Sequence, residues 1–184
     1  MVWIIIVAVI ALLILWFIST SNRLAKLKMK ATTAFADVDT YLTQRYDVIK
    51  SMEGTIKGAT KNEKNIFKEV IEARSAGLNA KTIDEKIDAD NKTTQALMNF
   101  VSLTESYPEL SSIKEFNTLL EDIKRLNSEL VGSRRYYNAI VGKYNAAIIM
   151  IPTNIVANVM GYKSMAFYEA TDEQRQNVVP NFDE

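Results

Sequence analysis

The residue types that carry out most protein catalysis are largely missing from this sequence of 184 residues. It has no cysteine and no histidine, which removes thiolate nucleophiles, Ser-His triads and nearly every zinc, haem or iron–sulfur site. Carboxylate, lysine, tyrosine and hydroxyl chemistry remains, and each needs a pocket that no motif of the sequence indicates. We therefore predict no catalytic residue, no metal site and no cofactor, and we expect the chain not to be an enzyme.

Arg45 is the side chain with the most unusual position. It interrupts a series of apolar residues at alternating steps of three and four: Phe35, Val38, Leu42, Ile49, Met52 and Ile56. A guanidinium in such a seam must pair with a carboxylate, because an unpaired buried charge costs several kcal/mol. We predict Glu72 and Glu105 as its partners in a buried ion pair. One interpretation is a ligand or switch site, and the favoured one is a structural pair that fixes helix register.

Tyrosine and asparagine recur seven residues apart near the C-terminal end of the chain. Tyr137 and Tyr144 are each followed by an asparagine, Asn138 and Asn145, and Tyr136 precedes the first pair. Positions seven apart share one face of a helix, so these side chains could line a polar cleft. The alternative, which is more common for tyrosine, is a set of core rings with hydroxyls at the rim.

Basic residues form another grouping with chemical meaning. Four cations and no acid lie between residues 23 and 30, namely Arg23, Lys26, Lys28 and Lys30. Such a cluster next to a membrane is attracted to anionic lipid by about 1 kcal/mol per cation. These residues either bind lipid headgroups or only set the topology of the chain. Over the whole chain, 22 Lys and Arg balance 22 Asp and Glu, so we expect no nucleic-acid partner.

An apolar stretch precedes these cations and predicts where the protein works. Residues 2–18 are all apolar, and residues 1–22 as a helix span about 33 Å, enough to cross a hydrocarbon core of about 30 Å. The positive-inside rule places the N-terminus outside and residues 23–184 in the cytoplasm, which predicts a single-pass membrane protein. The alternative is a signal peptide cleaved near Ser19, although no cationic segment precedes the apolar run.

Helical spacing continues through most of the chain, which has only six glycines and three prolines. The transmembrane helix is expected to continue without a break to about Met52, and a second helix to occupy residues 62–76 and stop at Gly77. Thr82 and Glu85 form a capping box that opens a third helix. A regular three-four alternation predicts a long helix over residues 112–150.

Apolar residues after Pro152 lie outside these main series. They are predicted to form a short amphipathic helix and a second patch that contact another subunit or the membrane: Ile155, Val156, Val159, Met160, Met165, Phe167 and Tyr168. Packing on the chain's own bundle is the default interpretation of these residues, and contact with a neighbouring subunit or with the bilayer is the alternative to it. The prediction is an all-α chain: a transmembrane anchor (1–22) that continues into an antiparallel helical bundle (23–150), then a short helix and an acidic tail (151–184).

The chain resembles the LemA family along almost its whole length. The resemblance lies in five segments in the family's order: QRYDVIKSM (44–52), NEKNIFKEVIEARS (62–75), TESYPEL (104–110), RRYYNAIVGKYNAAI (134–148) and IPTNIVANVMGYKSMAFYEA (151–170). It implies a single-pass protein of the bacterial cytoplasmic (inner) membrane with a helical cytoplasmic domain, and it supplies no catalytic residue. Magnetosome-associated relatives are linked to forming or shaping membrane.

The anchor, the long helices and the resemblance together favour one function. We expect a non-enzymatic scaffold that self-associates to organise or shape the membrane, with the lipid bilayer and further copies of the chain as partners. The alternative is an adaptor whose bundle docks a protein partner, such as a membrane protease or an envelope-stress factor.

Overall fold

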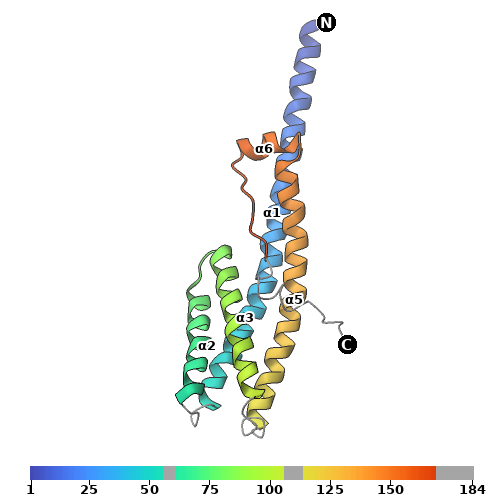
Figure 1. Ribbon diagram of the computed structural model, residues 1–184. Coiled ribbons are helices and arrows are strands. Elements are labelled where there is room, and N and C mark those ends of the chain that lie inside the picture. The colour runs from blue at the N-terminus through green and yellow to red at the C-terminus, as the bar shows by residue number, and fades with distance from the viewer. Residues whose placement is uncertain (56–60, 106–113, 169–184) are drawn as a thin grey trace, which may run out of the picture. The chain divides into compact units, whose positions relative to one another are not determined.

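The computed structural model describes the backbone of residues 1–55, 61–105 and 114–168, and the side chains of residues 1–52, 67–102 and 114–168. All regular secondary structure in these ranges is helical, which confirms the predicted all-α fold class. The helices are α1 (Val2–Thr55), α2 (Lys61–Asn79), α3 (Ile83–Glu105), α5 (Lys114–Ile149) and α6 (Thr153–Val159) (Figure 1).

Helix α1 extends unbroken over 54 residues, as predicted for an anchor that continues into the bundle. Its sequence has no proline, and its one glycine, Gly54, lies next to the last residue of the helix. The side chains of residues 1–16 are all exposed, although nearly all of them are apolar. Among the described helices, α1 has the length and apolar composition to cross a membrane by itself.

The start of α3 follows the predicted capping box. The backbone N–H of Glu85 donates to Thr82 Oγ1 at 3.2 Å, and the Glu85 carboxylate accepts from the N–H groups of Lys81 and Thr82 at 2.7 and 3.1 Å. These two backbone donors lower the pKa of Glu85. The box satisfies N–H groups that would otherwise have no partner at the helix terminus.

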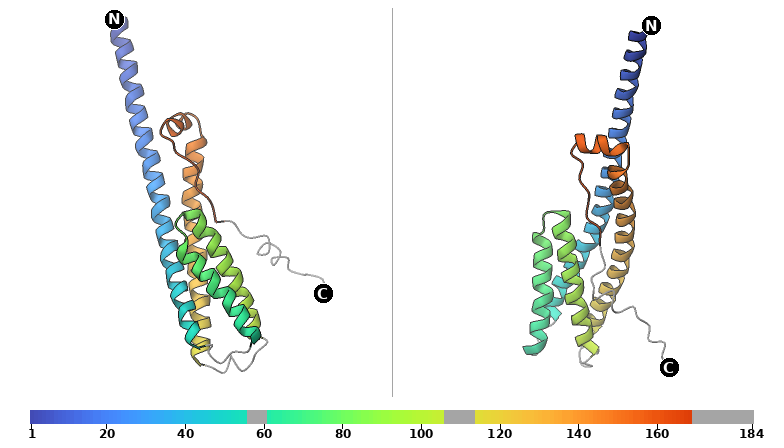
Figure 2. Two further views of the ribbon diagram at one scale, coloured as in Figure 1. Left: turned by 90° about the vertical axis from the view of Figure 1, so that its left-hand side faces the viewer. Right: turned by 45° about the horizontal axis from the view of Figure 1, so that its top comes forward.

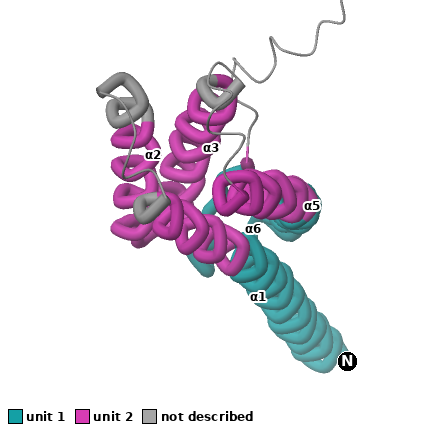
Figure 3. Tube along the Cα trace, turned by 90° about the horizontal axis from the view of Figure 1, so that it is seen from below, with its two compact units in different colours: residues 1–38, 133–167 teal, residues 39–132, 168–184 magenta. Residues whose placement is uncertain are grey.

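The chain forms two compact units, coloured separately in Figure 3. Unit 1 combines residues 1–38 with residues 133–167. Unit 2 contains residues 39–132 and, among the described residues, also Tyr168. Both α1 and α5 contribute residues to each of the two units. This division is not the predicted one, which separates an anchor at residue 22 and a tail at residue 150. Those two boundaries remain a prediction.

Unit 2 is an antiparallel bundle of α2, α3 and the adjoining parts of α1 and α5 (Figure 2). Phe100 on α3 joins its neighbours, with ring centroids 6.2 Å from Phe67 on α2 and 5.8 Å from Phe116 on α5. At the surface of the bundle, Lys86 on α3 forms an ion pair of 2.6 Å with Asp39 on α1. These contacts tie all four helical segments of unit 2 together.

Gly77 does not end α2 as predicted, since the helix continues to Asn79. A Cβ atom at Gly77 would overlap the hydroxyl and ring of Tyr46, which is buried against this turn of α2. The backbone carbonyl of Tyr46 also accepts a hydrogen bond of 2.8 Å from Arg74 Nε. The glycine is therefore a packing residue that lets α1 approach α2, and it is not a helix stop.

Candidate functional site

Three helices of unit 1 meet where α1 leaves its exposed apolar stretch. Leu24 of α1, Tyr144 and Ile148 of α5, and Val156 and Ala157 of α6 are buried in one cluster. Phe17, near the end of the apolar run, packs against this cluster. Helix α6 turns away from α5 by 92°. Its residues Val156 and Ala157 pack in the cluster with Leu24, so α6 lies beside this part of α1 (Figures 1 and 2).

The repeated tyrosine and asparagine of α5 hold an extended segment, residues 162–167. The hydroxyls of Tyr137 and Tyr144 donate to the backbone carbonyls of Ala166 and Lys163 at 2.9 and 2.7 Å. Asn145 forms two hydrogen bonds of 2.9 Å with the backbone of Met165, one as donor and one as acceptor. Both tyrosine rings are fully buried, and burial raises the pKa of Tyr144. Of the two interpretations, the structure supports core rings with hydroxyls at the rim.

An exposed apolar surface lies on the turn between α5 and α6 and on α6 itself. We call it the α6 patch, and it consists of Ile149, Met150, Ile151, Ile155, Val159 and Met160. Ile151 is 83% exposed and Val159 is 70% exposed, although both are large aliphatic side chains. Exposed apolar side chains gathered on one turn and one short helix favour contact with a protein or a membrane.

The predicted contact residues after Pro152 thus divide into two groups. Ile155, Val159 and Met160 are exposed on the α6 patch, and Phe167 is exposed as well. Val156 is fully buried in the cluster with Leu24, so its assignment to an intermolecular contact was wrong. Tyr168 is also buried, and Met165 packs against the cluster while its backbone bonds Asn145. Amphipathic spacing identified the helix, but it did not separate its inner face from its outer face.

A groove of about 1110 Å³ runs between α1 and α5 within unit 1, and we call it the α1–α5 groove. Four cations line it, Arg23, Lys26 and Lys30 from α1 and Lys143 from α5. Apolar side chains line it too, including Leu15 and Ile18 of the apolar run and Met150, the residue that follows α5. The groove therefore combines a basic surface with an apolar one.

The structure separates the four predicted cations into two sets. Arg23, Lys26 and Lys30 follow the spacing i, i+3, i+7, which puts them on one face of α1, and all three line the groove. Lys28 is absent from the groove lining, and its ammonium lies 5.8 Å from the centre of the Tyr162 ring in a cation–π contact. Lys143 was not predicted, because it is isolated in the sequence and only the packing of α5 on α1 brings it to this cluster.

Charge is distributed very unevenly along the chain. Eight of the 22 Lys and Arg residues lie in unit 1, but only one of the 22 acids does, Asp37. The balanced total therefore conceals a strongly basic unit 1. Four of these cations, Arg23, Lys26, Lys30 and Lys143, line the groove that begins at the end of the apolar stretch of α1.

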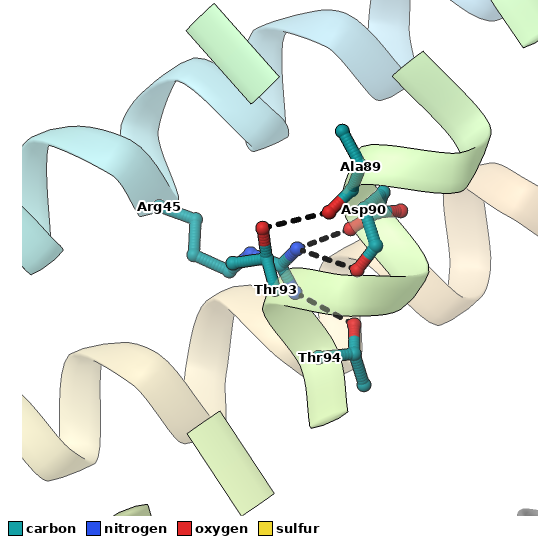
Figure 4. Close-up of polar contacts among 5 residues, drawn as sticks. All are labelled: Arg45, Ala89, Asp90, Thr93 and Thr94. Carbon is teal, nitrogen blue, oxygen red and sulfur yellow. Dashed lines mark hydrogen bonds and ion pairs between the residues drawn. The ribbon is translucent and has the colours of Figure 1, made fainter. Parts of the chain in front are cut away.

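In unit 2, Arg45 lies in a buried polar network with α3 (Figure 4). Its guanidinium pairs with the carboxylate of Asp90 and donates to Thr94 Oγ1 at 3.1 Å and to the Asp90 carbonyl at 3.4 Å. Arg45 is 1% exposed and Asp90 is 0% exposed. Thr93 donates to the Ala89 carbonyl at 2.8 Å on the same turn of α3. Desolvation by burial and the negative charge of Asp90 raise the pKa of the neighbouring Tyr46 hydroxyl, against the opposing charge of Arg45.

Asp90 replaces the predicted partner Glu72. Glu72 is 65% exposed and pairs with Lys68 one turn away at 3.5 Å on the surface of α2, so its assignment to Arg45 was wrong. The side chain of Glu105 lies outside the described residues. The sequence does contain a signal for Asp90. Ile83, Ile87, Leu97 and Val101 share one face of the helix, and Asp90 lies on the same face. It interrupts this apolar series as Arg45 interrupts the series on α1.

Within the side chains that the structure describes, no group of three or more acids forms a cluster able to hold a metal ion. The polar groups described above instead hold segments of the chain together or face the α1–α5 groove. The arrangement offers two surfaces for binding, the groove and the α6 patch.

Two curated proteins share part of this sequence. Magnetosome protein MamQ 1 and Magnetosome protein MamQ 2 of Paramagnetospirillum magneticum (strain ATCC 700264 / AMB-1) are each 24% identical to the chain over 83 residues. The match covers 45% of this chain and 30% of each relative. The chain thus corresponds to less than a third of the length of these relatives.

A family model matches a much larger part of the chain. The LemA family model aligns with residues 34–182, which include every described residue that follows the N-terminal 33. The match covers the buried Arg45 network, all of α5 and α6, and the tyrosines that hold the extended segment. On this evidence the chain belongs to the LemA family.

Proposed function

We propose that this LemA-family chain is a non-enzymatic, membrane-anchored scaffold that associates with further copies of itself to organise or shape the bacterial membrane. The observation that carries the proposal is the α6 patch. Its apolar side chains are exposed at the level where α1 leaves the apolar stretch, and exposed apolar surface of this kind needs a partner.

The position of the patch favours contact between copies. Single-pass anchors keep neighbouring chains in the plane of one membrane, which raises their effective concentration and allows a modest lateral contact to be sufficient. The proposal also accords with the partial similarity of the chain to two magnetosome proteins.

The proposed topology follows from the cations that border the apolar stretch. Residues 23–184 lie in the cytoplasm and the N-terminus lies outside, in keeping with the positive-inside rule. The clustering of eight cations in unit 1 supports this orientation, since those from α5 and from the extended segment add to the four on α1.

The natural absence of cysteine permits a direct test of self-association. A Val159→Cys variant places one thiol on the α6 patch, and a Leu78→Cys variant places one at an exposed apolar position of α2 in unit 2. After mild oxidation of isolated membranes, we expect disulfide-linked dimers for the Val159→Cys variant and few for the Leu78→Cys variant. Equal crosslinking in both variants would indicate random collision and would contradict the proposed contact.

The adaptor hypothesis predicts a different result in the same experiment. If the α6 patch binds another protein, the Val159→Cys thiol is protected from a soluble maleimide only in native membranes, and no homodimer forms. Purified protein in lipid vesicles then shows full labelling. Dimers in vesicles that contain only this chain would instead support the scaffold.

A further inference from the structure

We infer that the α1–α5 groove binds one anionic phospholipid, with the phosphate among the four cations and an acyl chain along the apolar end. The inference rests on the membrane placement of α1 under the proposed function, but not on self-association. It differs from a diffuse attraction of basic residues to a membrane surface, because it assigns a site with two helices as its walls.

The order of residues along the groove matches the order of chemical groups in a phospholipid. On α1 the lining changes from Leu15 and Ile18 to Ser19 and Asn22, and then to the three cations, which have Leu27 and Met29 among them. The rise from Ile18 to Lys26 is about 12 Å. The apolar end thus coincides with the end of the membrane-crossing stretch, where acyl chains meet headgroups.

The lining from α5 has the same polarity. Leu24 packs with Tyr144, and Phe35 lies 5.5 Å from Tyr137 between ring centroids, so α5 runs antiparallel to α1 within unit 1. Met150 is therefore next to the apolar end of the α1 lining, and Lys143, two turns earlier, is next to its basic end. Ala146 and Ala147 lie between them, and their small side chains leave room in the groove.

The charge of the groove is not neutralised by the described part of the chain. None of its four cations forms an ion pair there, whereas Lys68, Lys86 and Arg125 all do. The only acid of unit 1, Asp37, is not among the lining residues. A phosphate group therefore supplies the complementary charge, and a bound lipid also covers the apolar lining, which an inorganic anion leaves exposed.

The volume also suits an elongated amphipathic ligand. At about 1110 Å³ the groove exceeds the range of about 300–1,000 Å³ that is common for pockets of drug-sized molecules. Ligands of that size leave part of this groove empty, whereas a glycerophospholipid can extend from the cations to Leu15. Phosphate and phospholipid share the headgroup chemistry, so the test has to separate them.

Native mass spectrometry of the full chain in detergent, titrated with phosphatidylglycerol, measures the number and affinity of bound lipids. We expect one tightly bound phosphatidylglycerol per protomer and at least tenfold weaker binding of phosphatidylcholine. Lys26→Gln and Lys143→Gln, one from each wall, should each weaken the tight site about fivefold, equivalent to about 1 kcal/mol per cation.

Lys28→Gln is the matched control, because Lys28 belongs to the same basic cluster on α1 but lies outside the groove. It should change the affinity less than twofold. Equal losses in Lys28→Gln, Lys26→Gln and Lys143→Gln would show diffuse attraction and overturn the site. All three substitutions are at exposed positions, and circular dichroism checks that the helices are retained.

Two further outcomes would also overturn the inference. Displacement of phosphatidylglycerol by millimolar inorganic phosphate would identify an anion site without a lipid component, and equal binding of phosphatidylcholine would remove the role of the cations. The same spectra report the mass of the protein assembly. A monomer that binds the lipid would therefore reject the scaffold and keep the site, while an oligomer without the lipid would do the reverse.

Discussion

At the scale of single residues, Arg45 and Asp90 form a buried charge pair in which each group depends on the other. Arg45→Met leaves the Asp90 carboxylate buried without its guanidinium, so the free energy of unfolding should fall by about 3–5 kcal/mol. In the double variant Arg45→Met/Asp90→Leu both charges are absent, and most of that loss should be recovered. Chemical unfolding of the full chain in detergent, followed by circular dichroism, measures both changes.

Glu72→Gln provides the control for this comparison, since Glu72 forms an exposed pair with Lys68 and exposed pairs contribute little. We expect its unfolding curve to overlay that of the natural chain. A double variant as unstable as Arg45→Met would show that the pair does more than satisfy its own buried charges, and it would favour the ligand or switch interpretation of Arg45.

Two helical glycines should respond to alanine in opposite directions. A Cβ at Gly77 overlaps the hydroxyl and ring of Tyr46, a buried and rigid side chain, so Gly77→Ala should destabilise the chain by about 1–3 kcal/mol. A Cβ at Gly132 meets nothing within 4 Å, so Gly132→Ala should stabilise α5 by about 0.5–1 kcal/mol through helix propensity. Thermal unfolding of the two variants measures the signs, and stabilisation by Gly77→Ala would contradict the described packing.

The raised pKa of Tyr46 predicts a dependence of stability on alkaline pH. Burial and the charge of Asp90 favour the neutral phenol in the folded chain, so its pKa lies above the ordinary value of 10.0. The contribution of Tyr46 to stability is complete below pH 10 and is lost as the pH rises from there through the folded-state pKa. Unfolding free energies measured from pH 8 upward should fall more steeply for the natural chain than for Tyr46→Phe. Parallel curves would be evidence against this cause.

At the scale of elements, α5 has two functions: it forms a wall of the groove, and it holds the extended segment 162–167. Asn145→Ala removes both hydrogen bonds to Met165, and a hydrogen bond of this kind contributes about 0.5–1.5 kcal/mol. The Met165 amide, which donates to Asn145, should then exchange with deuterium roughly fivefold to tenfold faster. Tyr136→Phe is the control, because Tyr136 is exposed, and unchanged exchange in Asn145→Ala would contradict the proposed role of this motif.

The helices were predictable because their signals are local. Apolar spacing, the scarcity of proline and the Thr82–Glu85 box are all readable along one segment, and they placed α1, α3 and α5 well. Gly77 was misread because the helix-stop signal is the same residue that close packing requires. Its role depends on Tyr46, which lies 31 positions earlier in the chain.

The components of the site were only partly predictable for the same reason. The cations near the anchor are clear in the sequence. The sequence alone does not show which of them face α5 and lie in one groove with Lys143. The partner of Arg45 could have been found from the apolar series on α3, where Asp90 occupies a seam position. Which face of α6 is buried depends on Leu24 and Tyr144, and no pattern within residues 153–159 specifies it.

At the scale of the whole molecule, the uneven charge supports one orientation in the membrane. The eight cations of unit 1 all follow the apolar stretch in the sequence, and we place them on the cytoplasmic side. Protease added outside intact cells should leave residues 23–184 intact, and the same protease should digest them after the membrane is opened. Digestion in intact cells would reverse the proposed topology.

The central claim is that copies of this chain assemble in the membrane. It is tested most directly by the mass of the native particle, extracted from the membrane in lipid discs by an amphipathic polymer and measured by single-particle mass photometry and cryo-EM imaging. The scaffold predicts particles that contain several protomers of 20.8 kDa each, in contact near α6. Particles that contain one protomer at every protein concentration would contradict it.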